Sequence, residues 1–361
     1  MGQSVKTIAV ICNYKLLPER IGGMDYFFWL FDQKCKANNI AVHWFFPNYS
    51  EHGGYHDMTI FSSEYQNVEV FFYAHCQRQQ TQYTHIITHF VELCVPVFKK
   101  IKKTTSAQII QVDHNPRPNN GFAAKKNIKR KIKGLLYSQY IDLFVGVSDY
   151  CKNQLVLEYG SSIKRKTIVI FNGLEIDKFK KKSNFEFKGK FIVASHLREQ
   201  KGIQDLISAV HQLVKEAPYE FVIDLYGSGD YQEVLQKMVV DFSLQNYFVF
   251  KGSVDNLHVL YHQYDYLIHP SHGETFCYSV LESLLSDLPV ITTKNQGNVL
   301  GMVVENENGF LFEREDIAAL QSILVNILTG KKRIQKRSTV NDRLSQFSLD
   351  AMVANYYKLI E

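Results

Sequence analysis

Two carboxylates, Glu274 and Glu282, lie eight positions apart at what the sequence predicts to be a strand–loop–helix junction. The run 266–269 is short and apolar, and the run 279–285 has helical spacing. A loop that leads into a helix leaves the first N–H groups of that helix unpaired, so it can receive a phosphate. Carboxylates beside such an anion site suit hydroxyl-rich groups, since each accepts two or more O–H bonds. The pair therefore predicts a nucleotide-sugar pocket. The alternative is an ordinary strand–helix unit with one loop glutamate and one surface glutamate.

This segment resembles the E-x7-E motif of the retaining glycosyltransferases of family 4, which have the GT-B fold. Phe276 and the Pro-Val-Ile-Thr run at 289–292 make the match more specific. The resemblance implies that Glu274 is catalytic and contacts the transferred sugar, and that Glu282 contacts the ribose of the donor. It also implies that the turn between them binds the donor. The turn consists of Thr275, Phe276, Cys277 and Tyr278.

A second phosphate-binding element is expected in Ser195–Gly202, which follows a predicted strand and opens a predicted helix. Cations placed there form strong charge-assisted bonds with a diphosphate. The segment resembles the family pattern G-R-L-x-x-x-K-G, and Lys201 matches the lysine, which implies a catalytic, donor-binding role. His196 stands where arginine is usual, although a nearby phosphate would favour its protonated form. The sequence leaves His196 and Arg198 both open as the second cation.

Paired glycines, Gly22 and Gly23, follow the first predicted strand and its loop. Paired glycines let backbone N–H groups approach a ligand closely at a helix start. The pair resembles the G-G-x-E element of the family, which lies beside the donor phosphates and the acceptor. Asp25 replaces the commoner glutamate and is expected on the acceptor side. Its alternative role is to favour the helix dipole from the first turn.

His114 follows the predicted strand 109–112 and is the third catalytic candidate. A lone histidine is usually structural, but this one lies at the mouth of a parallel sheet beside a proline-constrained loop. The family often carries a histidine here, near the sugar that is transferred. Asp113 and Arg117 are its expected neighbours on the acceptor side, and His89 is a weaker candidate after an earlier strand.

Three further positions are expected to bind the donor. Gly227 lies in a glycine-rich turn that resembles the family's G-x-G element, without the full dinucleotide fingerprint. Ser253 and Val254 fall where the family's backbone meets the base.

The family commonly has G-G-x-x-E after the Pro-Val strand, whereas the stretch 297–301 lacks the glutamate. No Asp-x-Asp motif is present, and we expect no metal.

Short apolar runs alternate with amphipathic segments along the chain, and these elements position the candidate residues. This alternation is typical of a parallel sheet covered by helices. Predicted strands are 8–12, 41–45, 68–72, 85–88, 107–112, 143–147, 191–195, 221–226, 247–250, 266–269 and 289–292. Predicted helices are 26–38, 91–102, 150–159, 203–216, 231–242, 279–286 and 317–328. The expected fold is α/β of the GT-B class, with two doubly wound Rossmann-like domains facing a central cleft.

Domain boundaries follow from composition and from the N-G segment at 172–173. We expect an acceptor-side domain over 1–177, a lysine-rich linker over 178–190 and a donor-side domain over 191–344. Ser348 is a helix-cap candidate at the start of the last segment. The resemblance implies that 345–361 forms a helix that crosses back to the first domain. The alternative is a plain terminal helix on the second domain.

Composition sets broad limits on the kind of protein. The chain has 361 residues, a net charge of +5 and six cysteines without metal-ligand spacing. A length of this order suits two domains, and scattered cysteines in apolar runs indicate reduced thiols in a cytoplasmic protein. The first apolar run, 5–12, is too short to span a bilayer and predicts a buried strand.

The stretch Phe122–Leu136 combines six basic residues and no acid with an apolar stripe at helical spacing. A basic amphipathic helix can lie on anionic lipid, and we expect peripheral contact with the inner face of a membrane. The alternative is a solvated helix packed on the sheet. Nucleic acid is not expected, because the stretch lacks interleaved aromatic residues.

Together these features predict a retaining, metal-independent glycosyltransferase without a cofactor. Its donor would be a nucleoside-diphosphate sugar, with UDP favoured over GDP, and its acceptor a saccharide or lipid-linked hydroxyl in cell-surface polysaccharide or glycolipid synthesis. Two alternatives stay open, a nucleotide-sugar epimerase of GT-B fold and a non-catalytic subunit that binds sugar nucleotides.

Overall fold

The structure is a computed structural model that describes residues 6–361 except 20, 80, 116, 119–120 and 295–300. The chain divides into two compact units. The first unit comprises Met1–Asn115, Gly121–Leu174 and Gln346–Glu361, and the second comprises Pro116–Asn120 and Glu175–Ser345.

The first unit is built on a parallel sheet of seven strands in the order β3-β2-β1-β4-β5-β6-β7. The strands are β1 Lys6–Cys12, β2 Ile40–Phe46, β3 Thr59–Ser62, β4 His85–His89, β5 Gln108–Asp113, β6 Leu143–Gly146 and β7 Thr167–Val169. The order reverses between β1 and β4, and ligands of such sheets bind beyond the carboxyl ends of the strands at this reversal.

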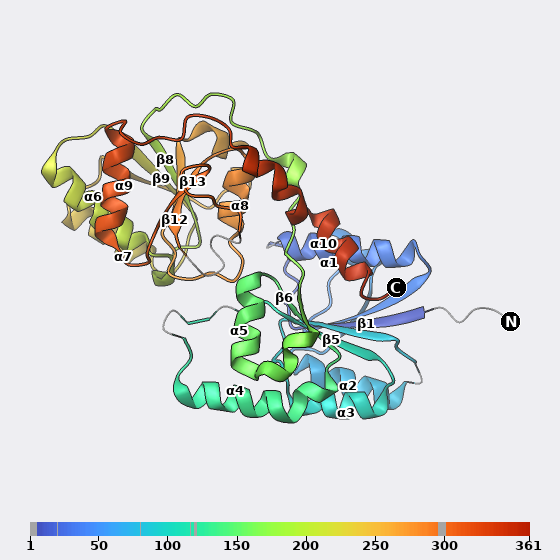
Figure 1. The fold of residues 1–361 in the computed structure, drawn as a ribbon. Coiled ribbons are helices and arrows are strands. Elements are labelled where there is room, and N and C mark those ends of the chain that lie inside the picture. The colour runs from blue at the N-terminus through green and yellow to red at the C-terminus, as the bar shows by residue number, and fades with distance from the viewer. Residues whose placement is uncertain (1–5, 20, 80, 116, 119–120, 295–300) are drawn as a thin grey trace. The chain divides into compact units, whose positions relative to one another are not determined.

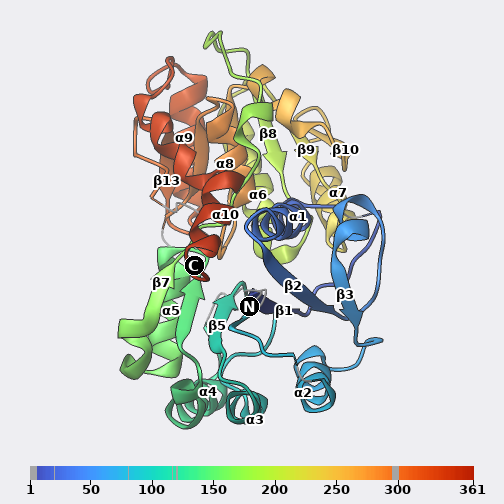
Figure 2. The same ribbon diagram turned by 90° about the vertical axis from the view of Figure 1, so that its right-hand side faces the viewer.

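Helices cover both faces of this sheet (Figures 1 and 2). On one face lie α1 (Gly23–Lys36) and α10 (Leu349–Tyr357). On the other lie α2 (Val68–Arg78), α3 (Pro96–Thr104) and α4 (Ala124–Tyr137), with α5 (Asp149–Tyr159) packed beside α4. The core between these layers is apolar and rich in phenylalanine, as expected for strands buried on both faces.

The second unit repeats the same strand order with six parallel strands, β10-β9-β8-β11-β12-β13. The strands are β8 Lys190–Ala194, β9 Val222–Tyr226, β10 Phe248–Gly252, β11 Tyr266–His269, β12 Val290–Thr293 and β13 Gly309–Phe312. The helices α6 (Ile203–Glu216), α7 (Gln232–Asp241) and α9 (Ile317–Leu328) lie on one face and α8 (Tyr278–Leu285) on the other (Figure 1). Both sheets therefore have the Rossmann-like arrangement that the sequence predicts.

The last helix, α10, packs within the first unit. Its cap is Ser348, whose hydroxyl accepts a hydrogen bond from the Ala351 N–H at 3.1 Å, as the sequence predicts. Tyr356 lies with its ring centroid 4.9 Å from that of Phe27 on α1. The segment before the helix forms a bridge between Ser348 and Leu174. The chain thus returns to the unit in which it began.

One predicted element is wrong, the strand at 68–72. This stretch is the first part of α2, because Asn67 caps the helix by accepting a hydrogen bond from the Val70 N–H at 2.9 Å. Val68 and Phe72 are buried while Val70 between them is 55% exposed, which is helical rather than strand spacing. The strands β3, β7 and β13 are absent from the prediction. The predicted helix at 91–102 begins only at Pro96.

None of the six cysteines, all of which lie in the described part of the chain, forms a disulfide, and all except Cys76 are buried. None of the described helices combines the length and apolar character that crossing a bilayer requires.

Candidate functional site

The loops that follow β8 and β11 carry the densest group of candidate residues, at the point where the strand order of the second sheet reverses. The loop after β8 contains Lys201, in a 3-10 turn over Glu199–Lys201. The loop after β11 contains Glu274. An ion pair joins Lys201 Nζ to Glu274 Oε1, so residues 73 positions apart meet where this fold class binds ligands.

Glu274 Oε1 accepts further hydrogen bonds within its own loop. The Ser271 hydroxyl donates at 3.1 Å, and Nε2 of His269, the last residue of β11, lies at 3.2 Å. Burial alone would raise the pKa of Glu274, but the hydrogen bond with His269 and the ammonium of Lys201 outweigh it and lower the pKa to about 2. The carboxylate is therefore ionised at every pH near neutrality and fixed in orientation.

Glycines allow the loops of this site to approach one another. Gly202 has φ +67°, and a Cβ there would lie 2.1 Å from the carbonyl oxygen of Pro270. Gly227, after β9, has φ +128°, and its Cβ would lie 1.8 Å from the carbonyl oxygen of Ser195. Any larger residue at either position would push apart the loops that follow β8, β9 and β11.

The remaining donor-side candidates surround the same loops. Burial, then Arg198, lowers the pKa of His196, with a smaller contribution from Lys201, so its imidazole is neutral at pH 7 without a ligand. The Ser253 hydroxyl lies 2.9 Å from that of Ser228, which joins the turns after β9 and β10, and Val254 follows directly. Arg198 directly precedes the 3-10 turn that ends at Lys201.

The predicted turn Thr275–Tyr278 leads into α8, with Cys277 as cap and Tyr278 as first residue. Phe276 and Cys277 are buried. Glu282 lies one turn further along α8, half-buried, and accepts a 2.8 Å hydrogen bond from the Tyr261 hydroxyl. Burial raises the pKa of Glu282, opposed by that hydrogen bond. One carboxylate thus lies in the loop and the other on the helix behind it, as the sequence predicts.

Within the described part of the chain, three potential metal ligands lie close together: His269, Glu274 and Cys277, with their donor atoms within 4.8 Å of one another. Cys277 Sγ lies 3.1 Å from His269 Nε2. A cation bound there would displace Lys201 from Glu274. It would also have to deprotonate Cys277, whose pKa burial and Glu274 raise. The residues therefore suit a lysine–carboxylate pair better than a resident metal.

In the first unit, Gly22 caps α1 and Gly23 is its first residue. Asp25 is buried and fully engaged: Oδ2 accepts hydrogen bonds from Gly22 N–H and the Tyr14 hydroxyl, both at 2.9 Å, and Oδ1 accepts one from Tyr55 at 2.6 Å. Asp25 thus fixes the glycine turn in position.

His114 follows β5 and meets His89, the last residue of β4. His89 Nδ1 lies 2.9 Å from His114 Nε2, so one ring donates to the other. The Phe90 ring stacks on His114 with centroids 4.3 Å apart. Burial lowers the pKa of His114 to about 3. Burial and the neighbouring His114 together lower the pKa of His89 well below its ordinary value. Both imidazoles are neutral near pH 7, and the pair lies beyond the carboxyl ends of adjacent strands.

The acceptor-side candidates Asp113 and Arg117 differ in placement. Asp113 ends β5, is buried, and accepts hydrogen bonds from the Asn115 N–H at 3.1 Å and side-chain amide at 3.2 Å. Arg117 belongs to the short segment grouped with the second unit. Of the loop 297–301, residues 297–300 lie outside the described part of the chain.

Sequence reasoning missed the residues that hold the candidates in place. His269 and Ser271 lie just before Glu274, the first residue of the E-x7-E motif. Their position at the end of the strand predicted at 266–269 could have identified them as neighbours of Glu274. Tyr261, which binds Glu282, lies twenty-one positions away without any local signal. His272 likewise binds Asp205 of α6 at 2.6 Å, and that hydrogen bond raises the pKa of His272.

Comparison with known proteins agrees with this arrangement. Residues 175–341 match the family model of the glycosyl transferases group 1. This match spans the second unit almost from end to end and includes the loops of Lys201 and Glu274. The second unit is therefore similar to the glycosyl transferases group 1.

Among curated relatives, a poly(glycerol-phosphate) alpha-glucosyltransferase of Bacillus subtilis is 30% identical over 151 residues, which is 42% of this chain and 22% of the relative. The next, the GtfA subunit of a UDP-N-acetylglucosamine–peptide N-acetylglucosaminyltransferase of Streptococcus pneumoniae, is 31% identical over 33% of this chain and 24% of its own length. The chain thus spans less than a quarter of these two relatives.

Solved structures match over the whole chain at lower identity. HepE of Anabaena, in complex with UDP and glucose, is 17% identical, with a TM-score of 0.72 and 99% of both chains covered. The lipopolysaccharide outer core galactosyltransferase WaaB is also 17% identical, with a TM-score of 0.74 and coverage of 98% and 99%. At this identity the likeness concerns the fold, which is GT-B, in agreement with the two Rossmann-like sheets.

Proposed function

We propose that this protein transfers a sugar from a nucleoside-diphosphate sugar to an acceptor hydroxyl, with retention of configuration and without a metal. One observation carries the proposal: the Lys201–Glu274 ion pair lies at the strand-order reversal of the unit that is similar to the glycosyl transferases group 1. Lys201 and Glu274 lie in two neighbouring loops. The cation suits the diphosphate of a nucleotide sugar, and the carboxylate suits the sugar that is bonded to it.

The leaving diphosphate gains negative charge as its bond to the sugar breaks. Lys201 pairs with Glu274, four positions before the first residue of α8, and would act with the N–H groups of that helix on the same anion, with His196 or Arg198 as the second cation. Binding of the diphosphate would raise the pKa of His196 and favour its charged form. Glu274 would then accept hydrogen bonds from sugar hydroxyls and Glu282 from the ribose.

Retention follows from attack on the face that the diphosphate leaves. The bond between the anomeric carbon and the phosphate oxygen breaks, and the acceptor oxygen bonds to the same carbon. The acceptor proton passes to an oxygen of the departing phosphate. No side chain needs to act as a nucleophile, and the cations do the work that a metal does elsewhere.

In the first unit, His114 would contact the transferred sugar as a neutral hydrogen-bonding group. Its pKa of about 3 makes it unsuited to carry positive charge at pH 7. The hydrogen bond between His89 Nδ1 and His114 Nε2 couples the tautomers of the two rings. Gly22 and Gly23 would offer backbone N–H groups near the donor phosphates, with Asp25 holding their turn.

UDP is the favoured donor nucleotide, and a cell-surface polysaccharide or glycolipid the favoured product. HepE was solved with UDP and glucose, and WaaB is by name a lipopolysaccharide galactosyltransferase. These two proteins share the fold of this chain and support the proposal by analogy.

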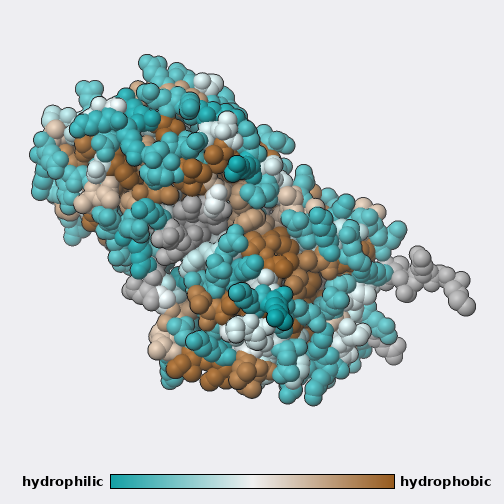
Figure 3. Space-filling view, in the orientation of Figure 1, coloured by the Kyte–Doolittle hydropathy of each residue, from teal (hydrophilic) through white to brown (hydrophobic). Residues whose placement is uncertain are grey.

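Peripheral attachment to the inner face of a membrane, from the cytoplasm, forms part of the proposal. Gly134 is the only buried residue of the described helix α4. The apolar stripe of α4 is exposed, with relative exposures of 51% for Ile132 and 77% for Leu135. Figure 3 shows apolar surface along the lower edge of the first unit, where α4 lies in Figure 1. Exposed lysines flank this stripe, so the surface suits anionic lipid.

The activity is tested by incubating the protein with a panel of nucleotide sugars, with and without saccharide and lipid-linked acceptors. Transferred product that keeps the anomeric configuration of the donor supports the proposal. An epimerised donor in the absence of acceptor identifies an epimerase. Binding without any turnover identifies a non-catalytic subunit.

The membrane contact is tested by sedimentation with phosphatidylglycerol vesicles. Replacing Ile132 and Leu135 by Asn should reduce the bound fraction several-fold, since buried apolar area and lysine charge act together. Leu157→Asn on α5 is the matched control, because Leu157 is 65% exposed in the same unit. An equal loss in the control would argue against a specific lipid-facing helix.

A further inference from the structure

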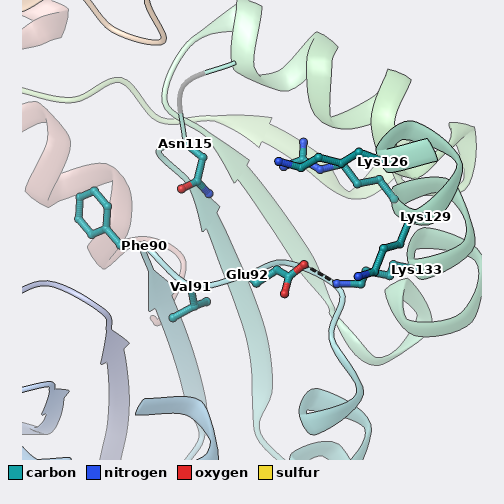
Figure 4. A pocket seen from close by; sticks show the side chains of 8 residues that line it. Phe90, Val91, Glu92, Asn115, Lys126, Lys129 and Lys133 are labelled. Carbon is teal, nitrogen blue, oxygen red and sulfur yellow. Dashed lines mark hydrogen bonds and ion pairs between the residues drawn. The ribbon is translucent and has the colours of Figure 1, made fainter. Parts of the chain in front are cut away.

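A pocket of about 380 Å³ lies within the first unit, between α4 and the loops that follow β4 and β5. Figure 4 shows side chains of α4 reaching across it towards Asn115, with Phe90 on the opposite side. Its lining is dominated by cations. The lining residues are Phe90, Val91, Glu92, Asn115, Lys126, Lys129, Arg130 and Lys133.

The cations of this pocket are only partly neutralised. Lys133 pairs with Glu92 across the pocket, and Arg130 pairs with the buried Glu158 of α5. The amine of Lys126 lies 4.0 Å from the centroid of the Phe122 ring. No carboxylate of the described residues lies within ion-pair distance of Lys126 or Lys129. Two positive charges therefore face the pocket without a counter-charge from the described chain.

The orientation of α4 explains why these charges gather. Lys126, Lys129, Arg130 and Lys133 follow the spacing of one helix face, and that face lines the pocket. The apolar residues lie on other faces, exposed to solvent. Gly134 fixes this arrangement, because a Cβ there would lie 1.9 Å from the carbonyl oxygen of Tyr159 on α5. A helix that turns its lysines towards the protein body and its apolar side outward is the reverse of ordinary packing.

The pocket adjoins the histidine pair. Phe90, which lines the pocket, stacks on His114. Its backbone has φ +59°, and Cys94, four residues on, has φ +52°. Left-handed backbone is costly for a phenylalanine, and such strain gathers at functional sites. The loop after β4 is thus held in a demanding conformation where it separates His114 from the cationic pocket.

We propose that this pocket binds a phosphate group of the acceptor substrate. A phosphate monoester or diester supplies the negative charge that Lys126 and Lys129 lack, and lysine ammonium groups bind phosphate well as point charges. The side-chain amide of Asn115 adds a neutral hydrogen-bonding group to the lining. The assignment of this phosphate to the acceptor rests on the proposed function, because Asn115, which lines the pocket, donates hydrogen bonds to the acceptor-side candidate Asp113.

The test compares three double variants with the wild type: Lys126→Gln with Lys129→Gln, the charge-retaining Lys126→Arg with Lys129→Arg, and Lys164→Gln with Arg165→Gln. The last is matched in charge, since Lys164 and Arg165 are exposed in the same unit and do not line the pocket. Two probes distinguish the source of the phosphate: soluble glycerol 3-phosphate, and phosphatidic acid in phosphatidylcholine vesicles. UDP affinity is measured in parallel.

The glutamine pocket variant should bind at least one probe about tenfold more weakly or worse, since two charge-assisted bonds are lost. The arginine variant and the charge-matched control should stay within about twofold of the wild type. Loss with glycerol 3-phosphate indicates a soluble phosphorylated acceptor, and loss with vesicles alone indicates a lipid-borne one. Equal weakening in the charge-matched control, or no weakening in the pocket variant, overturns the proposal.

The parallel UDP titration separates this inference from the proposed function. The pocket variant should bind UDP as tightly as the wild type. A wild type that binds a phosphate probe through Lys126 and Lys129 but never binds UDP contradicts the proposed function and leaves the phosphate pocket standing. A wild type that binds UDP but neither phosphate probe contradicts the pocket alone.

Discussion

The two units end equivalent strands with a histidine but surround it differently. His89 ends β4 beside β1, and His269 ends β11 beside β8, the same place in the same strand order. His89 meets a second neutral imidazole, His114, whereas His269 meets the carboxylate of Glu274, itself paired with Lys201. One fold thus supports a neutral hydrogen-bonding site in one unit and a charged site in the other, through the side chains that meet the histidine at the end of each strand.

The largest expected effect comes from the charged site. Glu274→Gln removes the charge that orients Lys201 and keeps the shape of the side chain, so kcat/KM for transfer should fall about 100-fold or more. Steady-state kinetics with the donor varied measure it. Glu233→Gln, an exposed glutamate at the start of α7, should leave the kinetics unchanged. Transfer that survives in Glu274→Gln would remove the central residue of the proposed site.

The neutral site should matter less and without titrating. His114→Asn should lower kcat/KM about 10-fold, because one hydrogen bond to the sugar is lost. The pH–rate profile of the wild type should show no limb due to His114 between pH 5 and 8, since its pKa is about 3. Comparison of the wild-type and His114→Asn profiles checks this. A limb near pH 6.5 that disappears in the variant would mean that His114 works as an acid or base.

Much of this contrast could be predicted from the sequence, and part of it could not. Glu274, Lys201 and His114 follow predicted strands, and the carboxyl ends of parallel strands meet at one edge, so local patterns suffice to place them. The contact between Lys201 and Glu274 depends on strand order, which local patterns do not encode. The strand predicted at 68–72 is wrong for a local reason. A run of five residues is too short to distinguish helical from strand periodicity, and the hydrogen bond to the Asn67 cap favours the helix.

Acid stability should separate the two sites by their pH windows. The pKa of Glu274 is lowered to about 2, so its contribution to stability is present above about pH 4.5 and is lost as the pH falls towards 2. The pKa of His114 is lowered to about 3, so the unfolded chain takes up a proton that the native state refuses, starting near pH 6.5. Each effect approaches about 1 kcal/mol per pH unit within its window.

Urea unfolding at a series of pH values measures both windows. The stability advantage of the wild type over Glu274→Gln should shrink only below about pH 4.5. The wild type should lose stability relative to His114→Asn already between about pH 6.5 and 4. Identical pH dependence in the two variants would contradict the electrostatic contrast between the sites.

The smallest expected effect is that of metal removal. Lys201 occupies the position on Glu274 that a cation would need, so EDTA should leave the transfer rate unchanged within error. Zn²⁺, which suits the ligand atoms of His269, Glu274 and Cys277, should inhibit at high concentration by displacing Lys201. A rate that falls with EDTA and recovers with Mg²⁺ would show that a metal takes part.

The account depends most on the claim that the charged site of the second unit binds the donor diphosphate. Calorimetric titration of UDP into the wild type, Lys201→Met and His114→Asn tests it directly. Lys201→Met should weaken UDP binding by about 10-fold or more, whereas His114→Asn should bind UDP as the wild type does. Unchanged UDP affinity in Lys201→Met, or its loss in His114→Asn, would contradict the account.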